Sequence, residues 1–536
     1  MSAVILLLCA LVCLISGYLF YGRFLARKYE LNNDQSTPSH VCEDGIDYVP
    51  SKAPVLMGHH FSSIAGAAPI IGPIIAVVFG WGAVFLWLIL GGIFMGGVHD
   101  FSALIASIRH GGKTMGEVIE DYVGMTGKRL FLVFAWFLLV LVVAVFAHAV
   151  ASVFVMEPST ATSSILFIVV AILFGLSIYR LSAPLWLSSI VGVLLLVGCV
   201  VFGIQHPIEL SFNTWKIILF VYVFFAATAP VWVLLQPRDY LSSFLLYAIL
   251  LAGVVGVFAA RPTIVTPMFG AFTQDLGTLF PILFVTVACG AISGFHSLVA
   301  AGTTAKQLNR ESDTRPIAYG SMLIETLLSV IALITAAVIL RSDYTALMQE
   351  GGPIGVFSAG IGSFVEHLGI PEKTGITFAA LAISAFALTT LDTATRLGRF
   401  MVQEFFEKSK APGFLYKNRY TGTILTIAFA AFFTFTGTRN ALWPLFGSAN
   451  QLLASLTLLA VTVWLTKLGK KSLFVRIPMY FMFSVTLAAL IVMVVKNWID
   501  GNVVLVVFSL LLFGIAVTLV LKAIESLRLL KEKGNL

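Results

Sequence analysis

The stretch Gly58-His-His-Phe-Ser-Ser-Ile-Ala-Gly-Ala-Ala-Pro-Ile-Ile-Gly-Pro73 lies inside a long apolar segment, where an uninterrupted helix would be the default. It nevertheless carries three glycines and two prolines. Proline removes a backbone donor and clashes with the preceding turn, and glycine weakens a helix by roughly 1 kcal/mol relative to alanine. In a bilayer no water satisfies the freed backbone groups, so such a break is tolerated only where it faces protein or a wet cavity. The stretch therefore predicts a broken membrane helix.

Two readings of this break are open. Broken helices hold substrates and ions at the midplane of secondary transporters. A kinked helix that packs against its neighbours through small residues would carry the same glycines. Because His59 and His60 lie beside the break, we favour a binding site.

The composition indicates a membrane protein with many spans. Of the 536 residues, 59% are hydrophobic and only 11% are charged, and the mean hydropathy is +0.98. No polar block is long enough to form a soluble domain. The net charge of +7 is explained by basic residues in loops, and we expect no nucleic-acid partner. The five cysteines form neither a CxxC pattern nor a disulfide framework.

Fifteen apolar segments are long enough to cross a bilayer. They cover residues 2–22, 55–79, 82–108, 129–155, 162–179, 185–204, 214–235, 240–260, 278–301, 317–340, 375–395, 421–437, 441–465, 477–496 and 502–522. If the N-terminus is outside and each segment crosses once, 27 of the 33 lysines and arginines lie at the cytoplasmic side. Because basic residues are enriched in cytoplasmic loops, we predict this orientation, with the C-terminus in the cytoplasm.

A short pattern suggests an internal repeat. Gly-x-His-x4-Ala-Gly occurs at residues 58–66 and again at 294–302. Seven predicted spans start from the first copy up to the second, and an odd number inverts the second copy. This predicts an inverted-topology repeat with paired broken helices, although four matched positions also arise by chance. The expected organisation is an N-terminal helix and loop (1–54), a first repeat with extra helices (55–277), a second repeat (278–466), and C-terminal helices with a cytoplasmic tail (467–536).

Several ionisable side chains fall in or near apolar spans, where a charge is costly and faces a cavity or a partner. For Asp392, an ion pair with Arg396 one helical turn away is the structural alternative to a functional role. Asp100 can likewise pair with Arg109. His148 stands among Ala and Val and is expected to be packed, whereas Glu325 is a candidate proton relay. The full set is His59, His60, Asp100, His148, His296, Glu325 and Asp392.

Several longer motifs resemble one family. They are Asp44-Gly-Ile-Asp-Tyr-Val-Pro50, the stretch 58–73, His99-Asp-Phe-Ser-Ala-Leu104 with Arg109-His-Gly-Gly-Lys113, Leu235-Gln-Pro-Arg-Asp-Tyr-Leu241, Thr390-Leu-Asp-Thr-Ala-Thr-Arg396 and Trp443-Pro-Leu-Phe-Gly-Ser-Ala-Asn-Gln-Leu452. Over most of its length the chain resembles the carbon-starvation protein A family. The resemblance implies a transporter of peptides or pyruvate in the cytoplasmic (inner) membrane, with proton coupling in the pyruvate-transporting members.

A more distant similarity of residues 286–340 to sodium–alanine symporters implies an all-α fold of the leucine-transporter type. The segments 55–79 and 278–301 would then be the paired broken helices. In that fold a cation lies between the first broken helix and the helix at 375–395. Here that position has the carbonyls near Ala65 and the hydroxyls of Ser384, Thr389 or Thr390. Such oxygens suit sodium, whereas the membrane histidines favour protons, which we prefer.

We expect a secondary transporter for a small carboxylate-bearing nutrient, held by helix N-terminal amides at the breaks. The expected substrate-binding residues are His60, Ala65, Gly66, Ala67, Ala68, Gly294, His296, Ser297, Thr303 and Thr304. The expected residues for cation or proton coupling are His59, Asp100, Glu325, Ser384, Thr389, Thr390 and Asp392. We expect no metal and no cofactor beyond the coupling ion, which is H⁺ or Na⁺.

Two other classes of function compete with a transporter. An intramembrane metalloenzyme is conceivable from the histidines, but no His-Glu-x-x-His motif is present and the pairs occupy different helices. A nutrient sensor that has lost transport is the other alternative. No Walker A pattern indicates an ATP-driven pump. The sequence leaves the exact substrate and the oligomeric state open.

Overall fold

The break expected near Gly66 is present in the computed structural model of the chain, which describes residues 1–45, 47–407, 412–436 and 439–532. Helix α4 (Ala53–Ala65) ends at Gly66, and α5 (Ala68–Ala76) begins two residues later. Pro69 lies in the first turn of α5, where its missing N–H breaks no helical hydrogen bond. A Cβ atom on Gly66 would approach Thr390 Oγ1 to 2.6 Å and Phe146 Cε1 to 2.9 Å. Glycine therefore permits close packing at the break.

A second break interrupts the helix around residue 290. Helix α14 (Leu279–Thr286) and α15 (Gly294–Gly302) are separated by residues 287–293. We expected irregular backbone from Gly294 to Thr304, but most of that segment is helix α15. The Gly-x-His pattern therefore precedes the break in the first copy and follows it in the second. The two copies do not occupy equivalent places about the breaks, so the pattern itself no longer supports an inverted repeat.

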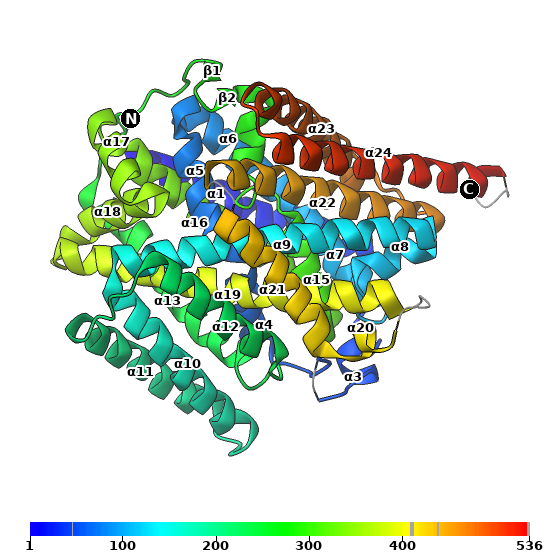
Figure 1. Cartoon of the computed structure of the whole chain (residues 1–536), viewed down its shortest axis with the longest axis horizontal. Coiled ribbons are helices and arrows are strands. Elements are labelled where there is room, and N and C mark those ends of the chain that lie inside the picture. The colour runs from blue at the N-terminus through cyan, green and yellow to red at the C-terminus, as the bar shows by residue number, and fades with distance from the viewer. Residues whose placement is uncertain (46, 408–411, 437–438, 533–536) are drawn as a thin grey trace.

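Most other described residues lie in helices (Figure 1). In the N-terminal half the elements are α1 (Ala3–Ser16), η1 (Gly17–Tyr21), α2 (Gly22–Tyr29), α3 (Pro38–Val41), η2 (Val77–Phe79), α6 (Trp81–Gly91), η3 (Gly92–Gly96), α7 (Gly97–Arg109), α8 (Met115–Val123), α9 (Met125–Met156), α10 (Pro158–Tyr179), α11 (Leu185–Gln205), α12 (Phe212–Thr228) and α13 (Leu235–Ala260).

The C-terminal half continues with helices after a short hairpin. The elements are β1 (Thr273–Gln274), β2 (Gly277–Thr278), η4 (Thr304–Lys306), η5 (Glu311–Asp313), η6 (Arg315–Gly320), α16 (Ser321–Ala337), α17 (Arg341–Glu350), α18 (Gly352–Glu366), α19 (Glu372–Glu407), α20 (Phe414–Lys417), α21 (Arg419–Thr436), α22 (Arg439–Lys467), α23 (Leu473–Ile499) and α24 (Val503–Glu532). Strands β1 and β2 pair antiparallel.

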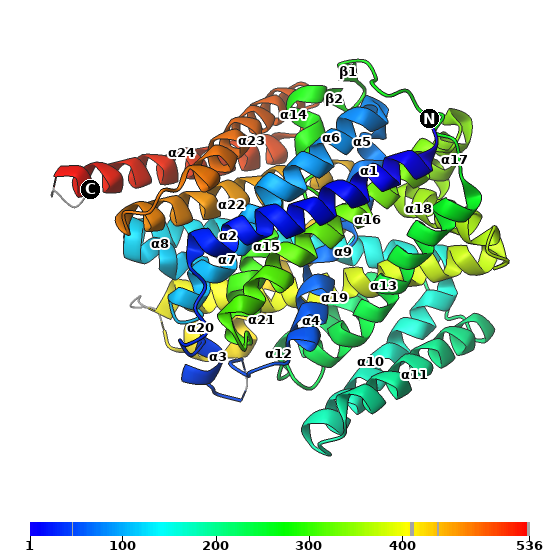
Figure 2. The same cartoon turned by 180° about the vertical axis from the view of Figure 1, so that it is seen from behind.

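The helices form a core of buried elements surrounded by peripheral ones. The two broken helices, α16, α19 and α22 are mostly buried. The α10–α11 hairpin lies at one edge of the molecule, and α23 and α24 lie at another (Figures 1 and 2). The continuous helix formed by α1, η1 and α2 crosses the face shown in Figure 2. This arrangement places both breaks inside the bundle, away from lipid.

The number of spans differs from the expected fifteen. Within the described residues, twelve helices are long and apolar enough to cross a membrane. The three other expected spans also correspond to helices, but they do not meet that standard. Helix α12 is a shorter apolar helix, the segment 278–301 is split into α14 and α15, and α21 is not among the twelve. A count of fifteen therefore stays a prediction.

The polar segment between α2 and α4 lies against the end of the second broken helix. Both Thr37 and Ser39 donate to the Leu308 carbonyl, at 2.6 and 2.7 Å. The Ser51 amide donates to the Gln307 carbonyl at 3.0 Å. These bonds attach the segment that precedes the first broken helix to the segment that follows the second.

Candidate functional site

The first of two buried polar groups is centred on Arg238. Its guanidinium contacts Asp392 of α19 and Tyr222 of α12, and it lies 3.2 Å from Oδ1 of Asp239. The Tyr222 hydroxyl also donates to Asp392 Oδ2 at 2.7 Å. We call Tyr222, Arg238, Asp239 and Asp392 the arginine cluster. It joins three helices, α12, α13 and α19.

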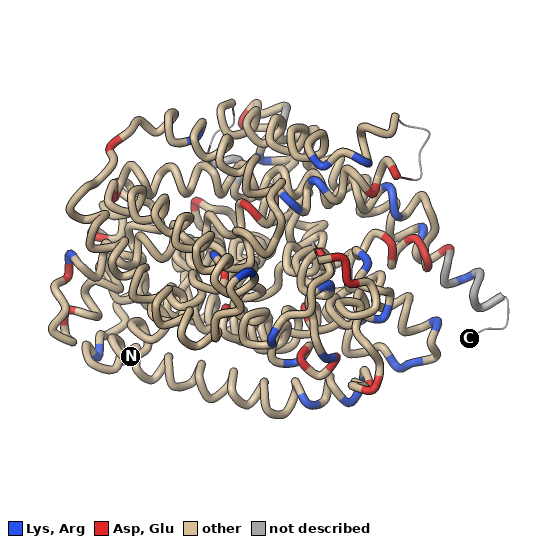
Figure 3. Tube along the Cα trace, turned by 90° about the horizontal axis from the view of Figure 1, so that it is seen from below, with Lys and Arg blue, Asp and Glu red and all other residues tan. Residues whose placement is uncertain are grey.

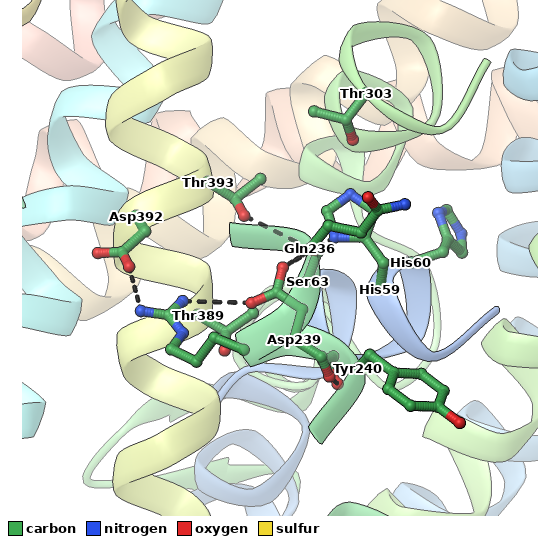
Figure 4. Close-up of polar contacts among 12 residues, drawn as sticks. His59, His60, Ser63, Gln236, Asp239, Tyr240, Thr303, Thr389, Asp392 and Thr393 are labelled. Atoms are coloured by element: carbon green, nitrogen blue, oxygen red, sulfur yellow. Dashed lines mark hydrogen bonds and ion pairs between the residues drawn. The ribbon is translucent and has the colours of Figure 1, made fainter. Parts of the chain in front are cut away.

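The arginine cluster is connected to the first broken helix through Asp239. His59 Nδ1 lies 2.8 Å from Asp239 Oδ2, and the Ser63 hydroxyl donates to the same oxygen at 3.4 Å. Ser63 also lies 3.5 Å from the hydroxyl of Thr393 in α19. Figure 4 shows these side chains between the helices, with Asp392 on the far side of α19. The first broken helix is thus tied to α13 and α19 by polar contacts.

The second buried group consists of His99, Asp100, His296 and Glu325, which we call the histidine cluster. Asp100 of α7 accepts from two histidines: His99 Nδ1 is 2.7 Å from Oδ1 and His296 Nδ1 is 2.8 Å from Oδ2. The other ring nitrogen of His296 lies 3.2 Å from Glu325 Oε2, close enough for an ion pair but without hydrogen-bond geometry. All four side chains are fully buried.

His60 lies between the two clusters. It follows His59 in the chain, and it interacts electrostatically with Asp100 and His296. Its Nδ1 atom is 2.8 Å from the Thr304 hydroxyl, directly after α15. Its Nε2 atom is buried and has no hydrogen-bond partner among the described residues. His60 therefore presents an unused ring nitrogen inside the protein, beside the first break.

Both local ion pairs that the sequence offered are absent among the described side chains. Asp392 pairs with Arg238, and Asp100 pairs with histidines. Arg396 instead donates to the carbonyls of Ala226 and Ala229 at the end of α12. Arg109 likewise donates to the carbonyls of Tyr29 and Glu30 at the end of α2, and its Nε atom lies 2.9 Å from Glu311 Oε1. Helix C-termini leave carbonyls unpaired and carry partial negative charge, which attracts both arginines.

The structure separates the three hydroxyls expected at a cation site. Thr390 Oγ1 donates to the Ser63 carbonyl at 3.4 Å, beside the first break. Thr389 donates to Ala385 of its own helix, and Ser384 to Leu381. Ser384 also lies 3.4 Å from the Ser164 hydroxyl of α10. Of these three hydroxyls, the described contacts place that of Thr390 between α19 and the first broken helix. A cation site there stays a prediction.

The expected substrate-binding residues are divided between the two breaks. Ala65, Gly66, Ala67 and Ala68 are buried at the first break, and His60 lies nearly two helical turns before Gly66. At the second, Gly294 packs against the α22 backbone, and Ser297 is 2.9 Å from the Thr457 hydroxyl of α22.

Two threonines follow α15. Thr303 donates to Val299 within α15 at 2.9 Å, and Thr304 contacts His60. These contacts mean that Gly294, Ser297 and Thr303 take part in helix packing or in bonds within α15.

The two breaks differ in how their helix N-termini are capped. Asn450 of α22 accepts the Phe295 amide at 2.8 Å, and it also contacts Ser293 and Cys289. The first turn of α15 is therefore already hydrogen bonded by a side chain. Helix α5 has no side-chain cap at its N-cap residue, Ala67. The two N-termini therefore differ in one bond: a side chain accepts the Phe295 amide of α15, whereas in α5 Pro69 has no N–H and the Ile70 and Ile71 amides bond the Ala67 carbonyl.

A cavity of about 320 Å³ opens beside the N-terminal ends of α4 and α13. Gln236 lies in its wall and donates to Ser51 at 2.7 Å and to Gln307 at 3.0 Å. Tyr240, one turn further along α13, also lines it. The cavity thus reaches the turn of α13 that carries Arg238 and Asp239.

Within the described ranges, no group of three or more His, Cys, Asp or Glu side chains is arranged to hold a metal ion. In the histidine cluster, Nδ1 of His99 and Nδ1 of His296 are both directed at Asp100. The geometry of this cluster suits hydrogen bonding and proton transfer between the side chains.

Sequence reasoning missed several residues of these clusters. Arg238 and Asp239 belong to the quoted motif 235–241 but received no role, and Tyr222 and Asn450 carried no signal of their own. The sequence signal for Arg238 and Asp239 was that two charged residues follow Pro237 at the start of an apolar segment. Arginine or aspartate at such a position requires a partner in the membrane. The partner itself lies 154 residues away and is visible only in the fold.

The chain is similar to known proteins over most of its length. The family model described as carbon starvation protein CstA matches residues 2–351 and 345–489. A peptide transporter CstA of Bacillus subtilis strain 168 is 33% identical, over 90% of this chain and 89% of the relative. The pyruvate/proton symporter BtsT of Escherichia coli K12 is 29% identical, over 85% and 76%. A solved manganese transporter of Eremococcus coleocola has a TM-score of 0.47 and 13% identity, over 90% of this chain and 99% of the other.

Proposed function

Since the chain belongs to the carbon starvation protein CstA family, we propose that it imports a small carboxylate-bearing nutrient, a peptide or pyruvate, by proton symport. The family and its relatives are transporters and not enzymes, and the chain is a multi-pass membrane protein. One relative is named a pyruvate/proton symporter and several are named peptide transporters. The cytoplasmic membrane is the proposed location.

The histidine cluster is the observation that carries this proposal. His296 stands between the carboxylates of Asp100 and Glu325, with no exposure of any of the three side chains. Histidine changes its charge near neutral pH, and buried ionisable groups inside a membrane bundle commonly form proton relays. The cluster joins α7, α15 and α16, so a change in its protonation acts directly on the second broken helix.

For the substrate we propose the first break. No side chain caps the start of α5 at Ala67, so this end offers the positive end of a helix dipole, which favours a carboxylate. His60 lies in the same broken helix, and its buried Nε2 atom, which has no hydrogen-bond partner among the described residues, is the proposed donor to the same group. Both features suit the carboxylate that pyruvate and peptides share, and they do not distinguish between the two.

Uptake into proteoliposomes tests the proposal directly. The purified protein is reconstituted and offered pyruvate, other small acids and a series of peptides, each with and without an inward proton gradient. We expect accumulation of at least one carboxylate-bearing substrate only when the gradient is present. Equal uptake in both conditions, with a response to sodium alone, would show a sodium symporter. Absence of uptake for the whole panel would favour a sensor.

A substitution at the first break tests the location of the substrate. Gly66→Leu should abolish uptake, because the new side chain enters the space held by Thr390 and Phe146. Gly198→Leu in α11 is the matched control, since a Cβ there meets nothing within 4 Å. Both proteins are checked for insertion and folding by size-exclusion chromatography. Normal substrate affinity in folded Gly66→Leu would remove the site from this break.

The proposed orientation has the N-terminus outside and the C-terminus in the cytoplasm. Figure 3 supports it: lysines and arginines gather on the half of the molecule that holds the C-terminus, and the N-terminus lies at the opposite end. The orientation can be tested on the segment between α2 and α4, which is predicted to be cytoplasmic. Ser39 in that segment is buried, whereas Cys42 is exposed and suits labelling.

The labelling experiment keeps Cys42 as the sole cysteine and compares it with a second variant carrying only Glu350→Cys. We expect an impermeant maleimide to label Cys42 only in inside-out vesicles and position 350 only in intact cells. Labelling of Cys42 from outside intact cells would reverse the orientation.

A further inference from the structure

The position that we expected for a coupling cation lies close to the guanidinium of Arg238. The expected cation lies between the first broken helix and α19. In the structure, Thr390 contacts the Ser63 carbonyl there, and Ser63 also contacts both Asp239 and Thr393. Arg238 contacts Asp239 on one side and Asp392 of α19 on the other. The guanidinium thus contacts α19 directly and is linked to the first broken helix through Asp239, which lies 2.8 Å from His59.

We propose that Arg238 takes the place of a sodium ion, as a tethered cation that makes transport independent of sodium. This inference rests on the proposed function in that it specifies the coupling ion. The oxygens around Arg238 are two carboxylates with nearby hydroxyls, which is the donor set of a hard cation. The guanidinium already occupies this set of oxygens and compensates one of their two negative charges, so a sodium ion placed there would meet its electrostatic repulsion.

The geometry distinguishes this role from an ordinary ion pair. Asp239 and Asp392 belong to different helices, and neither is exposed to solvent. Through His59 and Ser63, Asp239 also holds the first broken helix. Arg238 is thus the only positively charged group that the described contacts place between these two carboxylates. An arginine stays protonated at every physiological pH, so its charge is permanent.

Removing the guanidinium should convert the place into a sodium site. In Arg238→Ala, Asp239, Asp392 and the hydroxyls of Tyr222 and Ser63 remain around a vacated volume. We expect this variant to unfold at a lower temperature than the unaltered protein in choline chloride. Exchange of choline for about 100 mM sodium should then raise its Tm by about 2–4 °C, because sodium binds the folded state. The Tm of the unaltered protein should be the same in both salts.

Thermal stability in detergent is the chosen readout because it does not depend on transport. If no substrate of the panel is taken up, the proposed function fails while the sodium measurement still stands. Arg315→Ala is the matched control: its guanidinium stacks on Tyr18 and donates to the Tyr18 carbonyl, outside the arginine cluster. This control should lose its cation without acquiring a response to sodium.

Two results would overturn the inference. A sodium-dependent rise in Tm of the unaltered protein would show that sodium binds with Arg238 in place. A folded Arg238→Ala variant with equal Tm in sodium and choline would show that the place does not accept sodium. If Arg238→Ala does not fold, the double variant Arg238→Ala/Asp392→Asn removes the excess negative charge and is measured in the same way. A Tm of the folded double variant that rises in sodium supports the inference, and an indifferent one contradicts it.

Discussion

The charged side chains of the arginine cluster and of the histidine cluster are all buried, but the two clusters differ in the kind of charge they hold. In the first, a guanidinium that never loses its proton joins Asp239 and Asp392. In the second, two imidazoles share Asp100, and one of them also faces Glu325. The first broken helix contacts the arginine cluster, and the second broken helix contributes His296 to the histidine cluster. The first broken helix therefore contacts a cluster with a permanent positive charge, and the second contributes to a cluster of titratable side chains.

This difference suggests a division of labour. A permanent charge fixes the geometry of the helices that it joins, because breaking a buried pair leaves an uncompensated charge. A titratable cluster can change its net charge, and with it the contacts between α7, α15 and α16. We infer that the arginine cluster holds structure while the histidine cluster responds to protons. His60 is the side chain placed to connect them.

The largest expected effect is on stability and concerns the arginine cluster. Asp392→Ala leaves Arg238 with one carboxylate and removes the acceptor of Tyr222. We expect a loss of about 3–5 kcal/mol in the free energy of unfolding, measured by thermal or denaturant unfolding in detergent. Thr389→Ala is the control, because that hydroxyl donates to the Ala385 carbonyl of its own helix, and it should cost about 1 kcal/mol. Equal losses would mean that the cluster does not hold these helices.

The next effect concerns transport and the histidine cluster. His296→Gln retains an amide of similar reach but cannot carry a proton between Asp100 and Glu325. We expect substrate accumulation driven by a proton gradient to fall about 10²-fold, while equilibrium exchange of substrate persists. His367→Gln, an exposed histidine bonded to the Ser363 carbonyl, should leave both unchanged. An undiminished response to the gradient would remove His296 from the proton pathway.

The smallest expected effect concerns an exposed ion pair, which we compare with the buried ion pairs of the arginine cluster. Lys113 and Glu117 are 3.0 Å apart at the end of the bundle, and the lysine is half exposed. The hydrogen bond that Lys113 donates to the Glu117 carboxylate raises the pKa of Lys113. The pair therefore contributes stability below pH about 10.5 and loses it as the pH rises through the higher folded-state pKa.

Lys113→Gln should cost about 0.2–1 kcal/mol in the free energy of unfolding at neutral pH. Salt should reduce that cost, because exposed charges are screened, whereas the cost of Asp392→Ala should persist in about 1 M salt. Unfolding measured at low and high salt checks both. A loss for Asp392→Ala that disappears in salt would show that water reaches the arginine cluster.

Much of the fold follows from the sequence because the bilayer imposes strict rules on the chain. Apolar length predicted the helices, and Gly66 with Pro69 predicted the first break within a residue or two. The motifs predicted the family. The cost of burying charge indicated that His59, His60, Asp100, His296, Glu325 and Asp392 would face partners, and all six side chains are fully buried. These inferences need only local composition and the absence of water.

The identity of each partner depended on the tertiary structure. Arg396 is one turn from Asp392 and was the obvious partner, yet it caps the C-terminal carbonyls of α12 instead. Asp392 instead forms its ion pair with Arg238, which is distant in sequence. The same competition draws Arg109 to the end of α2 and leaves Asp100 to two histidines. A single sequence shows which charges must be paired, but helix ends from elsewhere in the chain compete for the same arginines, and only the packing of the helices decides that competition.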